Sequence, residues 1–213
     1  TWTVLTERTG DDFALLTLGL SDDEATRAVW PHSFSAELGI LIEDGRLDLE
    51  LEIDNTGDQA LEFTAALHTY IGVREVEESR LEGLHGFEYR DKADASRIKR
   101  DSGDVVLFEA ETDRVYPGVN RPLLLRESSR SLGINADGFP DVVVWNPWVE
   151  RSAAIADLPD DGVWRMWCVE AAAAREMRRI VRPCRCLTTS RAMNGHAPWF
   201  SGSSCTHTSS AFG

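Results

Sequence analysis

Two residues near the ends of expected strands have side chains suited to proton transfer. His68 stands in the stretch ALHTYIGV, and Glu170 ends the stretch VWRMWCVE. The residues at every second position before Glu170 are apolar, namely Cys168, Met166 and Trp164. Apolar neighbours raise the pKa of a glutamate above its reference of about 4.3, and such a carboxyl beside an imidazole could remove and deliver protons near pH 7. Alternatively, His68 is a hydrogen-bonded structural histidine, and Glu170 is simply a charged residue at the end of a strand.

The elements that must position these residues read as β-strands. Apolar residues alternate with mostly polar ones over 34–42 and end at Asp44-Gly45, which predicts a strand followed by a hairpin turn. A second strand returns over 47–53 and ends at the turn signal 55–57. The alternation resumes over 61–70, where every second residue from 61 to 67 is apolar.

The alternation over 61–70 puts His68 on the polar side, so we expect it to face away from the core. Further short strands are expected at 13–18, 105–109, 122–126, 142–145 and 163–170, and only DDEA and TRAVW suggest helix. These short, turn-separated strands favour an all-β, largely antiparallel sandwich.

Composition excludes several function classes. The 213 residues fit one main domain, and no apolar run reaches the roughly 18 residues of a membrane span. The start of the chain carries no secretion signal, so we expect a cytoplasmic location. The net charge of −14 argues against a nucleic-acid partner, but one or two local arginines could still bind a small phosphorylated substrate.

The chain changes character at about residue 174. Residues 1–174 hold 16 Lys+Arg and 35 Asp+Glu, whereas 175–213 hold six Arg and one Glu. We therefore expect a sandwich domain over 1–174 and a disordered or loosely packed tail over 175–213. The alternative is a zinc site in the tail, built from Cys184, Cys186, Cys205, His196 and His207. These residues lack the usual C-x2-4-C spacing, so we expect no metal.

Six separated segments together resemble one known family. They are TRAVWPHSF, LHTYIGV, VEESRLEGLHGFEYRDK, ETDRVY, VVWNPW and WCVEAA. In this order, over about residues 2–174, they resemble the hexose-6-phosphate mutarotases, which are the glucose-6-phosphate 1-epimerases of the galactose-mutarotase-like aldose 1-epimerase superfamily. The resemblance implies an antiparallel β-supersandwich whose concave sheet face binds a sugar.

The resemblance also implies an activity and roles for three residues. His68 would protonate the ring oxygen of a hexose 6-phosphate, Glu170 would remove the proton of the anomeric hydroxyl, and Asp113 would hydrogen-bond sugar hydroxyls. The implied enzyme needs no metal or cofactor, and we expect a monomer. Without the resemblance, Asp113 beside Arg114 also fits a surface ion pair.

The chain departs from the family pattern at both ends. The family has an N-terminal segment with an HGF-x-R type motif that supplies substrate-binding residues, and this chain begins after it. Beyond Glu170 the sequence AAAAREMRRIVRPCRC leaves the family pattern, so we expect a sandwich that lacks strands at both ends. Two alternatives remain open, a mutarotase of free aldoses and a non-catalytic carbohydrate-binding sandwich. The tryptophans of VVWNPW fit either core packing or stacking on a sugar ring.

Overall fold

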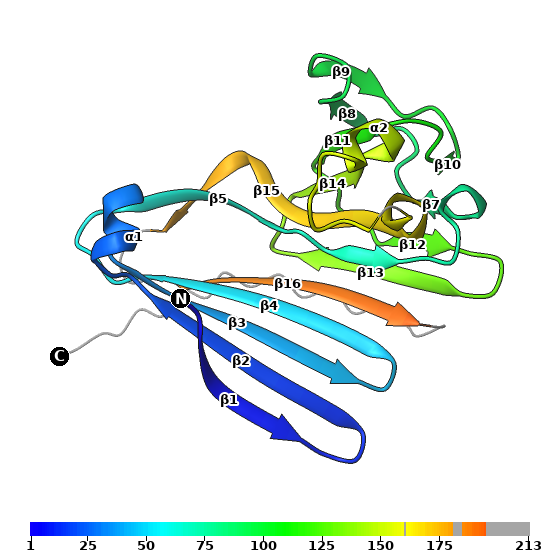
Figure 1. The fold of residues 1–213 in the computed structure, drawn as a ribbon. Coiled ribbons are helices and arrows are strands. Elements are labelled where there is room, and N and C mark those ends of the chain that lie inside the picture. The colour runs from blue at the N-terminus through cyan, green and yellow to red at the C-terminus, as the bar shows by residue number, and fades with distance from the viewer. Residues whose placement is uncertain (160, 181–184, 195–213) are drawn as a thin grey trace.

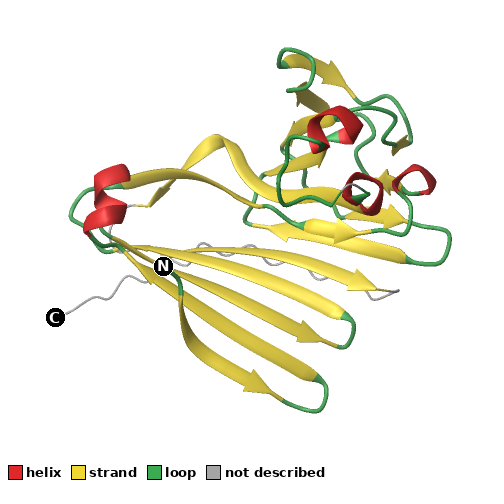
Figure 2. Cartoon of the chain, viewed as in Figure 1, coloured by secondary structure: helices red, strands yellow, loops and turns green. Residues whose placement is uncertain are grey.

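Two antiparallel β-sheets dominate the computed structural model (Figures 1 and 2), which describes residues 1–159, 161–180 and 185–194. The strands of the larger sheet are β1 (Thr3–Thr9), β2 (Phe13–Ser21), β3 (Phe34–Glu43), β4 (Arg46–Asn55), β7 (Arg80–Glu82), β10 (Val105–Val106), β12 (Leu123–Arg126), β13 (Ser131–Asp137) and β16 (Arg185–Asn194). Their order across the sheet is β1-β2-β3-β4-β16-β13-β12-β7-β10. The all-β, antiparallel expectation is confirmed.

The smaller sheet lies over one end of the larger sheet (Figure 1). Its strands are β5 (Leu61–Leu67), β8 (Glu88–Asp91), β9 (Arg97–Arg100), β11 (Thr112–Pro117), β14 (Asp141–Asn146) and β15 (Met166–Ile180), with β6 (Tyr70–Gly72) also paired to β15. Their order is β5-β15-β14-β11-β8-β9. The strands β15, β14 and β11 are therefore direct neighbours in space although they are far apart in the chain.

Short helical segments connect the strands. They are α1 (Glu24–Val29), α2 (Trp148–Ser152) and the 3-10 turns η1 (Val76–Glu78) and η2 (Gly162–Arg165). The sequence predicted α1, whose N-cap Asp23 forms a capping box with Thr26, but it did not predict the other three. None of the helices in the described part of the chain has the length and apolar character that a membrane-crossing helix requires.

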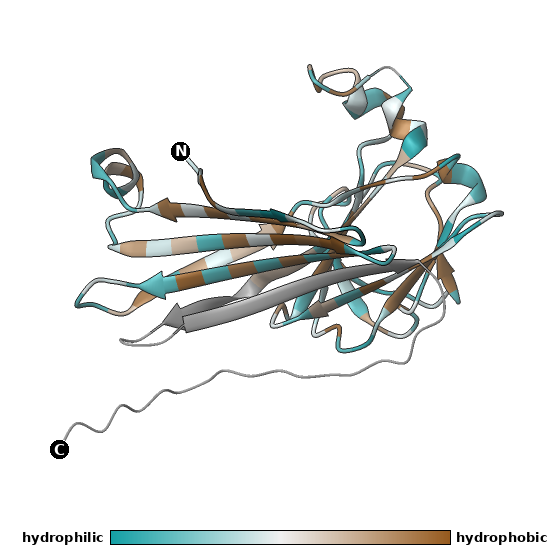
Figure 3. Cartoon of the chain, turned by 90° about the horizontal axis from the view of Figure 1, so that it is seen from below, coloured by the Kyte–Doolittle hydropathy of each residue, from teal (hydrophilic) through white to brown (hydrophobic). Residues whose placement is uncertain are grey.

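The hairpin between β3 and β4 forms where the sequence predicted it. Asp44 and Gly45 both have positive φ angles, 45° and 71°, as a two-residue type I′ turn requires. The turn sets the register that pairs Ile42 with Leu47 and Ile40 with Leu49. Along these long strands, hydrophobic and hydrophilic residues alternate visibly (Figure 3).

The main core lies between the two sheets. From the smaller sheet it takes every second residue of β14 and β15, including Val142, Val144, Trp167 and Val169. From the larger sheet it takes the buried residues Leu81, Leu123, Leu125 and Ile134. Because side chains alternate along a strand, the intervening residues of β14 and β15 must point to the outer face of the smaller sheet.

Two strand boundaries differ from the sequence prediction. The expected strand over 61–70 is interrupted at His68 and Thr69, where the Thr69 N–H donates to the Leu67 carbonyl at 2.9 Å. The expected strand over 163–170 begins only at Met166, because the buried Asn146 amide donates to the Val163 and Met166 carbonyls at 3.0 and 3.1 Å and holds a turn there.

The described part of the segment after residue 174 lies in two strands. The strand β15 continues to Ile180, and β16 lies between β4 and β13 in the larger sheet. Strand pairing uses backbone groups that every residue except proline supplies, so the lack of hydrophobic alternation in 185–194 did not reveal it. Residues 181–184 and 195–213 lie outside the described residues. The domain boundary, the loose packing of the tail and its alternative zinc site therefore stay predictions.

Candidate active site

The register of four strands collects a group of polar and aromatic side chains on the outer face of the smaller sheet. One row across the sheet pairs Asp113 of β11 with Trp145 of β14, Trp145 with Cys168 of β15, and Cys168 with Tyr70 of β6. Two positions further along β15 stands Glu170, which shares this face with Cys168. The prediction that His68 faces away from the core is confirmed. Leu67, the residue before His68, pairs with Ala171, the residue after Glu170, and the His68 side chain contacts Glu170 on the outer face.

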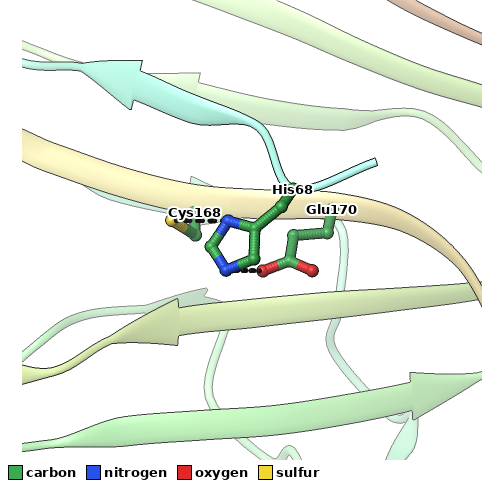
Figure 4. Close-up of side chains that lie close together, drawn as sticks. All are labelled: His68, Cys168 and Glu170. Atoms are coloured by element: carbon green, nitrogen blue, oxygen red, sulfur yellow. Dashed lines mark hydrogen bonds and ion pairs between the residues drawn. The ribbon is translucent and has the colours of Figure 1, made fainter. Parts of the chain in front are cut away.

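The structure brings His68 and Glu170 into contact. The His68 Nε2 atom lies 3.3 Å from Glu170 Oε1, and the other ring nitrogen, Nδ1, lies 3.8 Å from Cys168 Sγ (Figure 4). The His68 side chain is 50% exposed, whereas that of Glu170 is only 7% exposed. The imidazole is therefore open to solvent, whereas the carboxylate beside it is almost fully buried.

Two aromatic side chains hold the His68 ring. Tyr70 stacks on it with ring centroids 4.7 Å apart and an interplanar angle of 21°, and Trp145 meets it edge-on at 5.5 Å and 79°. Trp145 is half-buried against Val115 and Val143 on the same outer face. The two tryptophans of VVWNPW therefore have different environments. Trp145 lies at the site, and Trp148 packs against the main core.

The environment of Glu170 disfavours its charged form. Burial is the main cause and raises the pKa of the Glu170 carboxyl above its ordinary value, and the negative charge of Asp113 raises it further. His68 and Lys92 act in the opposite direction. The sequence predicted this rise in the pKa of Glu170. Trp164, however, is not one of its apolar neighbours, because it lies in η2 and packs against Trp148 at 4.9 Å.

Asp113 faces the site, and its partner is not Arg114. The Lys92 Nζ atom lies 3.8 Å from Asp113 Oδ1. The backbone N–H of Lys92 also donates to the backbone carbonyl of Asp113 at 2.7 Å. Arg114 follows Asp113 in β11 and therefore points to the opposite face, 3.7 Å from Asp101. The surface ion pair between Asp113 and Arg114 that the sequence allowed is therefore wrong.

A polar cavity of about 270 Å³ lies at Arg114, on the other face of β11 from Asp113. Within it, Tyr116 donates its hydroxyl hydrogen to Asp101 at 2.9 Å, and Arg114 lies over the Tyr89 ring at 4.7 Å. Neither His68 nor Glu170 lines this cavity. The other described histidines, His32 and His85, lie in loops and contact Trp30 and Gly103 respectively.

Three site residues were missed by sequence reasoning, namely Cys168, Tyr70 and Lys92. Alternation along each strand placed Cys168 and Tyr70 on the right face, but only the pairing of β6 with β15 brings them to His68. Within the described residues, one ligand atom from each of His68, Cys168 and Glu170 lies within 4.8 Å of both others, which is compact enough to hold a metal ion. The arrangement offers a proton donor and a proton acceptor side by side, and the Asp113–Lys92 pair lies on the far side of β14 from them.

Comparison with known proteins identifies the family. The sequence profile described as Aldose 1-epimerase matches residues 1–183. Two relatives named as proposed glucose-6-phosphate 1-epimerases, from Cenchrus ciliaris and Escherichia coli, are 34% and 30% identical to the chain over 168 and 183 residues. These alignments cover 76% and 85% of this chain but only 51% and 60% of the relatives, so the chain spans little more than half of their length.

A solved structure supports the same assignment. The crystal structure of a proposed mutarotase from Salmonella typhimurium superposes with a TM-score of 0.81 and 26% identity, over 91% of this chain and 65% of that one. The predicted galactose-mutarotase-like sandwich is thereby confirmed. Because the family profile matches residues 1–183 of this chain and the fold is shared with the Salmonella typhimurium protein, the chain belongs to the aldose 1-epimerase family.

Proposed function

We propose that this chain carries the acid–base site of a hexose-6-phosphate 1-epimerase, which interconverts the α and β anomers of a sugar such as glucose 6-phosphate. The observation that carries the proposal is the 3.3 Å contact between His68 and Glu170 on one face of the sheet. The two oxygens that exchange protons in a cyclic hemiacetal are bonded to the same carbon. An acid and a base that serve them must therefore lie side by side, as these two groups do.

The proposed reaction opens and recloses the sugar ring. Glu170 takes the proton of the anomeric hydroxyl while His68 gives a proton to the ring oxygen, and the bond between that oxygen and C1 breaks. Rotation about C1–C2 presents the other face of the aldehyde, and the two residues exchange roles as the ring recloses. A buried Glu170 with a raised pKa changes protonation state more readily near neutral pH than an exposed glutamate does.

Asp113 and Lys92 are the proposed sugar contacts next to this pair. Strands lie about 4.8 Å apart and rise about 3.4 Å per residue, so Asp113, two strands and two residues away from Glu170, has its Cα atom about 12 Å from that of Glu170. Both side chains extend over the same face, which leaves room between their carboxylates for one pyranose ring. The phosphate preference rests on the names of the relatives.

The test follows the α to β relaxation of glucose 6-phosphate and of glucose by exchange NMR. We expect acceleration above the spontaneous rate for the phosphorylated sugar, and a loss of at least about 100-fold in turnover for His68→Ala and for Glu170→Gln. Matched controls are His85→Ala and Glu77→Gln, which change the same residue types outside the site. Acceleration with glucose alone would point to a mutarotase of free aldoses.

Sugar binding without any acceleration would instead indicate a non-catalytic carbohydrate-binding sandwich. Near-normal turnover in either site variant would refute the assigned roles. The proposal also includes a monomer that acts in the cytoplasm, which size-exclusion chromatography and localisation of the tagged protein would test.

A further inference from the structure

Nitrogen, sulfur and oxygen donors meet at the His68–Glu170 pair. Ligand atoms of His68, Cys168 and Glu170 all lie within 4.8 Å of one another, and imidazole, thiolate and carboxylate are the groups that bind zinc in proteins. We propose that these three residues bind a soft divalent cation such as Zn²⁺, and that the bound ion inhibits the site instead of serving the reaction.

The separation of the donor atoms fits a tetrahedral site. With Zn–S near 2.3 Å and Zn–N near 2.0–2.1 Å, the sulfur and nitrogen of two zinc ligands lie about 3.5 Å apart. Cys168 Sγ and His68 Nδ1 are 3.8 Å apart, so a shift of a few tenths of an ångström would bring both onto one ion. Glu170 faces the other ring nitrogen (Figure 4), so its carboxylate would have to rotate toward Cys168 to supply the third bond.

The charge balance also favours a divalent cation. Cys168 and Glu170 are both buried, and each carries a negative charge when it binds a metal ion. A bound Zn²⁺ stabilises the thiolate and the carboxylate, and the three charges sum to zero. The proton of the Cys168 thiol is released to solvent when the S–Zn bond forms.

The half-exposed His68 ring gives the ion a route from solvent, and the fourth position of the ion would face that side. The ion would occupy a nitrogen of His68 and an oxygen of Glu170, which are the groups assigned to proton transfer. Inhibition of anomer exchange is the part of the inference that rests on the proposed function, whereas metal binding does not depend on it.

The binding test uses Co²⁺ as a spectroscopic substitute for Zn²⁺. The chain has three other cysteines, so the experiment is done on the full chain with Cys184, Cys186 and Cys205 replaced by serine, which leaves Cys168 as the sole thiol. We expect one equivalent of Co²⁺ to produce the near-ultraviolet charge-transfer absorption of a cobalt–thiolate bond, and added Zn²⁺ to remove it. Absence of this absorption in a protein with the melting temperature of the unchanged chain would overturn the proposal.

Two variants in the same background identify the ligands. Removal of partners that only support metal ligands costs about 10- to 100-fold in affinity, so removal of a ligand should weaken Zn²⁺ binding by at least about 100-fold. We expect this loss for the near-isosteric Cys168→Ser. His68→Ala, at a half-exposed position, tests the same site should the buried serine prevent folding. Unchanged Zn²⁺ affinity in either folded variant would refute the site.

An activity assay separates inhibition from binding. If anomer exchange is observed, micromolar Zn²⁺ should slow it and EDTA should restore it. Zn²⁺ that binds with the cobalt signature but leaves an active protein unaffected would contradict the inhibitory part alone. If no exchange is observed at all, the proposed function fails, and the absorption experiment still decides whether the metal site exists.

Discussion

The contact between Tyr70 and His68 leads to a quantitative prediction about positioning. Tyr70 stacks on the His68 ring at 4.7 Å, yet it is 56% exposed and contributes little to the core. An aromatic pair is worth about 0.5–1.5 kcal/mol beyond its buried area. Since each 1.36 kcal/mol is tenfold, complete loss of this orientation in Tyr70→Ala should lower kcat by about 2- to 13-fold.

The matched control is Tyr70→Phe, which keeps the ring and should retain nearly the full kcat. Both variants should melt within a few degrees of the unchanged protein, because substitution of an exposed residue is usually within about 0.5 kcal/mol. The assay is the exchange NMR of glucose 6-phosphate anomers over a range of concentrations. A positioning role lowers kcat and leaves KM nearly unchanged. Equal losses in the two variants, or a change confined to KM, would refute it.

Three further predictions follow from burial and charge. In Glu170→Gln the melting temperature should exceed that of the unchanged protein at neutral pH, because the folded state raises the pKa of this carboxyl and its ionisation therefore costs stability. The difference in melting temperature should shrink as the pH falls toward about 4.3, the pKa of the carboxyl in the unfolded chain. A difference that does not change with pH would contradict this. Asp113→Asn should raise KM and, by removing a charge that raises the pKa of Glu170, move the acidic limb of the kcat profile to lower pH. An unmoved limb would show that the Asp113 charge does not act on Glu170. Trp167→Ala should lower the free energy of unfolding in urea by about 3–5 kcal/mol, since the side chain is fully buried. Trp2→Ala, at a 40% exposed position, should change this free energy by less than about 1 kcal/mol. Similar effects of the two substitutions would place the core elsewhere.

Periodicity predicted the faces of the strands better than their ends. The alternation over 34–42 and 47–53 predicted β3, β4 and the turn between them because hairpins use local signals. The alternation over 61–70 correctly put His68 away from the core. It could not show the break at His68 and Thr69, because this depends on a backbone hydrogen bond that side-chain patterns do not encode.

Register across distant strands explains the residues that sequence reasoning missed. Cys168 contacts a histidine 100 positions earlier in the chain, and a period-2 pattern fixes which face a residue occupies but not which residue lies opposite. The partner of Asp113 shows the same limit. Its neighbour in sequence, Arg114, necessarily points to the other face, and Lys92 reaches Asp113 only because β8 lies beside β11.

The strand β15 contributes residues both to the main core and to the candidate site. Trp167 and Val169 point inward to the main core, and Cys168 and Glu170, which alternate with them, point outward to His68. Trp167 is fixed twice, by stacking on Phe108 at 3.9 Å and by donation of its indole N–H to Ser79 at 2.6 Å. A core substitution that lets this segment move would therefore displace the carboxylate as well, because the backbone between inward and outward residues is shared. Trp167→Phe, which keeps the stacking ring but loses the bond to Ser79, should lower kcat more than its modest loss of stability explains. Unchanged kcat in the folded variant would show that the site is positioned independently of this contact.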